Sequence, residues 1–262
     1  TGLFDSELYE GSIQPHTYYN LFTDTATYFL TWDNTTNHLR IPTNTQNDNS
    51  GLTPTTSHHE TEGTLQVNEY ATGRFFGGSG GDFQLSSYDG GEGWTGGRVQ
   101  KGASQDFNFV MSDLVVANDT PNVEIIAIGR NSLQHVVTVL AGPDISSLSS
   151  LGTFSFAGYT AYRQLQDISP ALIGANGELV IRCTVTGIDG ATDFVSFSSV
   201  RLTYPQTLML EAGVSKNLYF EPSTDSRRYL QIAVPNPESF NFYDVSDPYS
   251  VVKLPQNSFS GR

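Results

Sequence analysis

The chain has 262 residues, of which 12% are aromatic and 15% are charged, and its formal net charge is −14. A field of that sign repels nucleic acid and anionic membrane surfaces, which argues against a nucleic-acid-binding role. One cysteine rules out an internal disulfide, and no apolar run reaches the roughly 18 residues of a membrane span.

The first half of the chain alternates a strand signal with polar and glycine-rich stretches. Thr25–Trp32 is β-branched and aromatic, which predicts a strand, and Asp33-Asn34 predicts the turn after it. Residues 43–63 are rich in Thr, Asn, Ser, His and Glu, so we expect a surface loop or a linker there. Gly73 to Gly102 is dense in glycine and poor in aliphatic residues, which indicates irregular loops.

The second half carries stronger strand signals. Val123–Gly129 and His135–Ala141 are apolar runs separated by a Gly-Arg-Asn turn, and together they predict a hairpin. Glu178–Thr186 follows the Asn176-Gly177 turn and alternates apolar with polar residues. Asp193–Tyr204 is a further long alternating segment. Helical periodicity is scarce, since the best stretch, 161–172, is short and interrupted by a proline.

These patterns predict an all-β protein, a jelly-roll-like β-sandwich with a smaller N-terminal β unit and a C-terminal β segment. We place the N-terminal unit and its linker loop at 1–62, the sandwich at 63–212, and the C-terminal segment at 213–262. No catalytic or cofactor-binding residue is assigned.

Cys183 is the obvious candidate for a nucleophile. Strand alternation places it on the same face as Leu179, Ile181 and Val185, which we expect to be buried. A buried thiol is raised in pKa and shielded from substrate, so we interpret Cys183 as a core residue.

The densest group of potential metal ligands is His58-His59-Glu60, with Glu62 close by. Adjacent histidines on an extended chain point to opposite sides and rarely share a metal, so a solvated loop is expected. Asp189 and Asp193 flank a tight turn and are interpreted as turn formers.

Two binding sites remain open alternatives to plain loop chemistry. Asp82, Asp89 and Glu92 lie among glycines, where carboxylates and free carbonyls could hold calcium. Trp94 could stack on a sugar ring, although aromatic residues also fill a sandwich core. The 27 acidic residues offer many carboxylate pairs for glycoside hydrolysis, but no pair is marked by its surroundings.

Four segments together resemble the pre-catalytic region of gingipain-like cysteine peptidases and of the related type IX secretion sortase. They are Leu21–Trp32, Gly73–Gly77, Asp193–Tyr204 and Asp244–Pro248, in the order of that family. The chain departs from the family pattern at three positions: Gly78 replaces an acidic residue, Gln206 a common basic residue, and Ser246 the usual threonine.

The resemblance implies a non-catalytic, β-rich module that packs on or positions a downstream protease domain of the same polypeptide. It also implies a secreted or cell-envelope location in a bacterium, in the Bacteroidetes, and a cysteine-type endopeptidase as the full-length parent. The family's catalytic His and Cys lie after the last motif, so no residue here inherits them. The alternative is a carbohydrate-binding jelly-roll module whose partner is cell-surface glycan.

Overall fold

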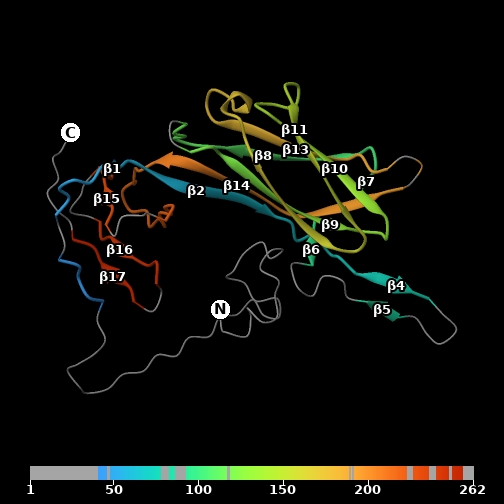
Figure 1. Ribbon diagram of the computed structural model, residues 1–262, viewed down its shortest axis with the longest axis horizontal. Coiled ribbons are helices and arrows are strands. Elements are labelled where there is room, and N and C mark those ends of the chain that lie inside the picture. The colour runs from blue at the N-terminus through green and yellow to red at the C-terminus, as the bar shows by residue number, and fades with distance from the viewer. Residues whose placement is uncertain are drawn as a thin grey trace, which may run out of the picture. The chain divides into compact units, whose positions relative to one another are not determined.

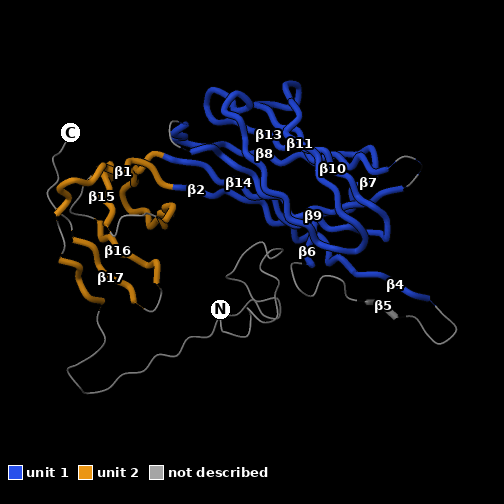
Figure 2. Tube along the Cα trace, in the orientation of Figure 1, with its two compact units in different colours: residues 1–26, 59–206 blue, residues 27–58, 207–262 orange. Residues whose placement is uncertain are grey.

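The structure is a computed structural model, and it describes residues 41–45, 48–77, 83–85, 93–116, 119–188, 190, 192–222, 227–235, 240–247 and 250–255. These residues form two compact units, shown in Figure 2. The larger unit contains 59–206, and the smaller one contains the described residues before 59 and after 206. Nearly all regular structure is β, as the sequence predicted.

The larger unit is an antiparallel β-sandwich. Its four-stranded sheet has the order β11-β10-β13-β8, with the bounds Ser149–Ala157, Gln134–Gly142, Glu178–Val185 and Ser104–Val110. Its five-stranded sheet has the order β12-β9-β14-β2, with the bounds Ala161–Asp167, Asn122–Gly129, Phe194–Thr207 and Ser57–Leu65. A further strand, β7 (Val99–Gln100), also pairs with β14. The two layers are seen edge-on in Figure 1.

The core lies between these sheets and is built from inward-facing aliphatic and aromatic residues. On β13, Leu179, Ile181, Cys183 and Val185 are all buried, as the alternation predicted. On β14, Phe197 lies in the same core. The pairing of β14 with β9 shifts register between Phe197 and Ser199. Burial of such side chains stabilises a sandwich by roughly 1.5–3 kcal/mol each.

β9 differs from its neighbours because both of its faces are buried. Ile125 and Ala127 face the sandwich core, whereas Ile126 and Ile128 face outward and pack with Ala71. An additional layer therefore covers part of the five-stranded sheet. This explains why residues 125–128 of β9 are a continuous apolar run and not an alternating one.

The predicted hairpin of 123–129 and 135–141 is wrong in its pairing, although both strands exist. β9 pairs with β12 and β14, while β10 pairs with β11 and β13 in the opposite sheet. Along the described residues from β8 to β14, the chain changes sheet at every step except β10 to β11. The Gly-Arg-Asn segment is therefore an arch between layers, as in jelly-roll-like folds, and not a hairpin turn.

Two stretches expected as loops contain strands. Residues 57–63 belong to β2, an edge strand whose polar sequence reflects its single sheet neighbour. The glycine-dense stretch holds three short strands in addition to β7. Of these, β4 (Arg74–Phe76) pairs with β5 (Phe83–Leu85), and β6 (Trp94–Thr95) pairs with β3 (Glu69–Tyr70), which lies just before the stretch. The weak helical stretch 161–172 is the strand β12 and a 3-10 turn, η1 (Pro170–Leu172).

The smaller unit is built from short ladders. β1 (Pro54–Thr55) pairs in parallel with β15 (Tyr229–Leu230), and β16 (Tyr243–Asp244) pairs with β17 (Val252–Lys253). Its described buried apolar side chains are Leu208, Leu210 and Phe240. No helix among the described residues is long and apolar enough to cross a membrane.

Candidate functional site

Cys183 lies in the middle of β13 and is fully buried in the sandwich core. Burial raises the pKa of its thiol well above the ordinary range, and the charge of Asp106 acts in the same direction. The thiolate is the attacking form of cysteine, so this environment opposes nucleophilic chemistry. The prediction that Cys183 is a core residue is confirmed.

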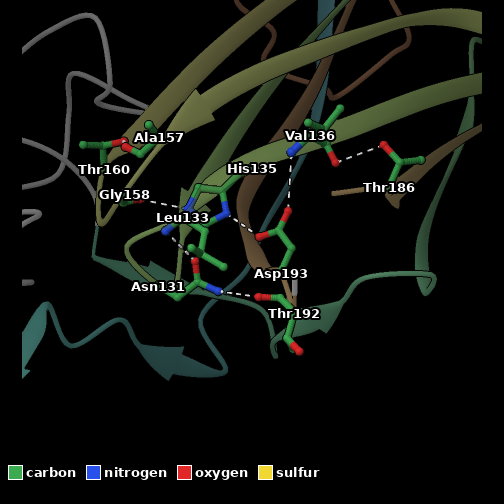
Figure 3. A network of polar contacts seen from close by, with 10 residues as sticks. All are labelled: Asn131, Leu133, His135, Val136, Ala157, Gly158, Thr160, Thr186, Thr192 and Asp193. Carbon is green, nitrogen blue, oxygen red and sulfur yellow. Dashed lines mark hydrogen bonds and ion pairs between the residues drawn. The ribbon is translucent and has the colours of Figure 1, made fainter. Parts of the chain in front are cut away.

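A second buried polar feature, missed by the sequence analysis, joins the two sheets. Nδ1 of His135, on β10, lies 2.5 Å from Oδ1 of Asp193, just before β14. Neither side chain is exposed. The other carboxylate oxygen of Asp193 accepts the Val136 amide at 3.4 Å, as Figure 3 shows. The interpretation of Asp193 as a simple turn former is therefore wrong, and Asp189 lies outside the described residues.

In catalytic triads, too, a carboxylate orients the histidine that acts as the base. Whether His135 could be such a base therefore depends on what its other ring nitrogen contacts. Nε2 of His135 lies 3.0 Å from the carbonyl oxygen of Gly158. Because a carbonyl can only accept, Nε2 carries a proton and donates it. Phe156 covers the ring at a centroid distance of 4.8 Å. His135 is thus a structural link between the sheets, closed to any substrate.

The two adjacent histidines of β2 point to opposite sides of the strand, as neighbouring residues on an extended chain do. His58 is 2% exposed, whereas His59 points to the other side and lies 3.2 Å from Asp119. Their opposite orientation is as expected, but they lie on a strand and not in a solvated loop. Among the residues that the structure describes, no three His, Cys, Asp or Glu side chains form a metal-binding group. The calcium candidates Asp82, Asp89 and Glu92 lie outside the described residues.

Trp94 lies on β6 and is directly opposite Tyr70 on β3. The two rings meet edge to face, with centroids 5.7 Å apart and planes at 83°. Trp94 is 44% exposed and Tyr70 is 48% exposed, so both rings are accessible to a ligand. Trp94 could be predicted from the sequence and Tyr70 could not, because cross-strand register between two-residue strands has no signal in the sequence.

The β3–β6 pair is anchored by hydrogen bonds from Arg130 to the side chains on the face opposite the two rings. Glu69 and Thr95, the next cross-strand pair, point toward Arg130 at the end of β9. The Nη1 group of Arg130 lies 2.6 Å from Oε1 of Glu69 and 2.9 Å from Oγ of Ser196, and 3.3 Å from Oγ1 of Thr95. The Arg130 side chain is 3% exposed. Charge-assisted hydrogen bonds of this kind fix the layer that carries Tyr70 and Trp94.

The structure describes some, but not all, of the residues in the four segments that resemble the gingipain-like family. Arg74 of β4 lies over the ring of Phe76, 4.5 Å from its centroid. Asp244 accepts the Ser246 amide at 3.0 Å, which makes the expected turn, and hydrogen bonds from Ser246 lower the pKa of Asp244. Leu21–Trp32 and Pro248 lie outside the described residues.

The sequence matches no protein-family model and no curated protein. Its fold is similar to dimeric latent PorU from Porphyromonas gingivalis, with a TM-score of 0.57, 10% identity, and coverage of 85% of this chain and 20% of that chain. A second solved structure is the CBM36-1 domain of a multidomain xylanase from the hindgut metagenome of Trinervitermes trinervoides. The TM-score to it is 0.32 and the identity 14%, with coverage of 55% of this chain and 96% of that chain. The chain thus spans 20% of the PorU length, and at 10% identity that likeness is one of fold alone.

Proposed function

We propose that this chain is a non-catalytic β-rich module of a larger, secreted gingipain-like cysteine peptidase. Its role is to pack on and position a protease domain that follows it in the same polypeptide. The observation that supports this proposal is the PorU-like fold, which extends over 85% of this chain but only 20% of the chain it resembles. The order of the family-like motifs supports the same assignment, and with it a bacterial cell-envelope or extracellular location.

The chemistry of the described residues agrees with a positioning role. The lone thiol is buried in the core, and the His–Asp pair is closed by the Gly158 carbonyl. Nucleophilic catalysis needs a nucleophile and a base within hydrogen-bond reach of each other and of substrate. Cys183 and His135 do not meet that requirement, since both are fully buried.

The test measures binding between this chain and the polypeptide that the same reading frame encodes downstream of it. The polypeptide encoded after residue 262 is produced separately and titrated with this chain by calorimetry. We expect a defined complex, and activity of the downstream domain that changes when the module is present. A reading frame without a downstream peptidase-like domain, or a downstream domain indifferent to this chain, would show the proposal to be wrong.

A second candidate function, carbohydrate binding, is favoured by one specific observation. Trp94 is half exposed beside a second aromatic ring on a layer anchored by a buried arginine. Sugar sites use such aromatic faces together with a few fixed polar groups. Glycan binding is compatible with the positioning role, because a module of a secreted peptidase can also hold the enzyme at a cell surface.

A further inference from the structure

We propose that Tyr70 and Trp94 form the two walls of a subsite for a neutral pyranose ring. This inference rests on the carbohydrate-binding function proposed above and names its site and its ligand class. The two rings stand nearly perpendicular, at 83°, and each leaves almost half of its surface in water. Such a corner offers one ring face for stacking against the C–H face of a sugar and a second ring against the edge of that sugar.

The residues that share the outward face of β3 are polar and uncharged. Along this segment exposure alternates: Asn68, Tyr70 and Thr72 are exposed, whereas Ala71 is 1% exposed and packs inward on Ile126. Residues two apart on an extended chain lie on one face, so an amide and a hydroxyl flank the Tyr70 ring. These groups can hydrogen-bond to the hydroxyls of a sugar.

Charge restricts the ligand to neutral glycans. Glu69, the acidic residue of this strand pair, points away from the rings and binds Arg130. Arg130 is therefore engaged by Glu69, Thr95 and Ser196 and does not offer its charge to an anionic sugar. The formal net charge of −14 repels uronates and sulfated glycans.

The site is also pre-organised. Thr95 is completely buried beside Trp94, and the Thr95 and Gly93 carbonyls accept the amides of Asn68 and Ala71. The Tyr70 ring lies directly against Gly93, where an added Cβ would come within 2.6 Å of the ring. Because the rings are held before a ligand arrives, little conformational freedom is lost on binding.

The test is affinity electrophoresis of the whole chain in gels that contain hydroxyethylcellulose, galactomannan or glycogen as neutral probes, and polygalacturonate as an anionic probe. We expect retardation by at least one neutral polymer and none by polygalacturonate. Trp94→Phe should retain most of the affinity, whereas Trp94→Leu and Tyr70→Ala should each weaken it by about tenfold or more. Tyr243→Ala removes an equally exposed ring in the smaller unit and should change nothing. Circular dichroism confirms that each variant is folded.

The outcomes test the Tyr70–Trp94 subsite and the carbohydrate-binding function separately. If no neutral polymer retards the wild-type chain, carbohydrate binding itself is wrong. If retardation persists in both Trp94→Leu and Tyr70→Ala, the chain binds glycan elsewhere and the subsite is wrong. If Trp94→Leu binds as well as Trp94→Phe, ring stacking is not the contact. If polymer binding is absent but the downstream domain binds in a Trp94-dependent manner, this surface is a protein interface.

Discussion

His135 and Asp193 join the two sheets of the sandwich through one short contact, 2.5 Å between Nδ1 and Oδ1, with both side chains fully buried. The residues are 58 positions apart in the sequence and lie on neighbouring ends of β10 and β14. Buried polar groups are costly unless their hydrogen bonds are satisfied, and here each has a second protein partner. This pair links β10 of the four-stranded sheet to the start of β14 in the five-stranded sheet.

We expect Asp193→Ala and His135→Ala each to lower the free energy of unfolding by about 3–5 kcal/mol, because either change leaves a buried group without its partner. Urea unfolding followed by circular dichroism measures the loss. His59→Ala is the matched control, since His59 faces Asp119 at 3.2 Å with the carboxylate side chain 47% exposed. It should cost about 1 kcal/mol or less. Equal losses for His135→Ala and His59→Ala would contradict the assigned link.

The Cys183 thiol should make stability depend on alkaline pH. Burial raises its pKa in the folded chain, whereas in the unfolded chain the thiol ionises near its usual pKa of about 8.5. Its contribution is therefore complete below about pH 8.5 and is lost as pH rises, by up to about 1.4 kcal/mol per pH unit. Urea midpoints at pH 7.5 and 9.5 measure this loss.

Cys183→Ala is the control for that experiment, because it removes the ionising group and leaves every other titration in place. The difference in unfolding free energy between the variant and the wild type should shrink by about 1 kcal/mol between the two pH values. Native protein should also resist a thiol reagent until it is unfolded. Rapid labelling of the native chain would show that the thiol is accessible, contrary to the fold.

Arg130→Met should loosen the layer that carries the aromatic pair. The change removes the donors to Glu69, Thr95 and Ser196. We expect hydrogen exchange of the Asn68 and Ala71 amides, which bond across the β3–β6 pair, to accelerate by about tenfold or more. Amides of the four-stranded sheet should keep their rates.

Arg163→Met provides a comparison on the same sheet. Arg163 lies 3.3 Å from Glu124, but Glu124 also binds Arg201 at 2.6 Å and so retains a partner. Exchange of the Asn68 and Ala71 amides should be unchanged in this variant. Slow exchange of these two amides in Arg130→Met would mean that the layer is held by something other than the arginine.

Gly93→Ala should turn the Tyr70 ring away from Trp94, since a Cβ at this position would come within 2.6 Å of that ring. Because the Tyr70 ring is the far end of a side chain and not backbone, global stability should change by only about 0.5 kcal/mol. The near-ultraviolet circular dichroism of the aromatic pair should weaken. Gly97→Ala, where a Cβ meets no atom within 4 Å, should leave the spectrum as it is.

Much of the fold could be predicted from the sequence because period-two patterns report which residues face a core. The strands at 178–185 and 194–207, and the burial of Cys183, follow from that pattern. The pairing of 123–129 with 135–141 could not be predicted, since both a hairpin and an arch satisfy the same apolar runs and the same turn residues. β2 was missed because an edge strand with polar residues resembles a loop.

The candidate site was less predictable still. Trp94 was found by its residue type alone, while Tyr70 and Arg130 were missed, because they are brought to it by pairing between distant segments. The sequence around Asp193 predicts a turn former, since nothing near it in the chain indicates a contact with a histidine 58 positions earlier. Local patterns indicate the strands, and long-range contacts assemble the site.

Hydrolysis of casein and of fluorogenic peptides by the purified chain, under reducing conditions, tests most directly whether this module is non-catalytic. With its only thiol in the core of the sandwich, we expect no turnover above buffer for the wild type or for Cys183→Ala. Turnover by the wild type that disappears in Cys183→Ala would contradict the account at its centre.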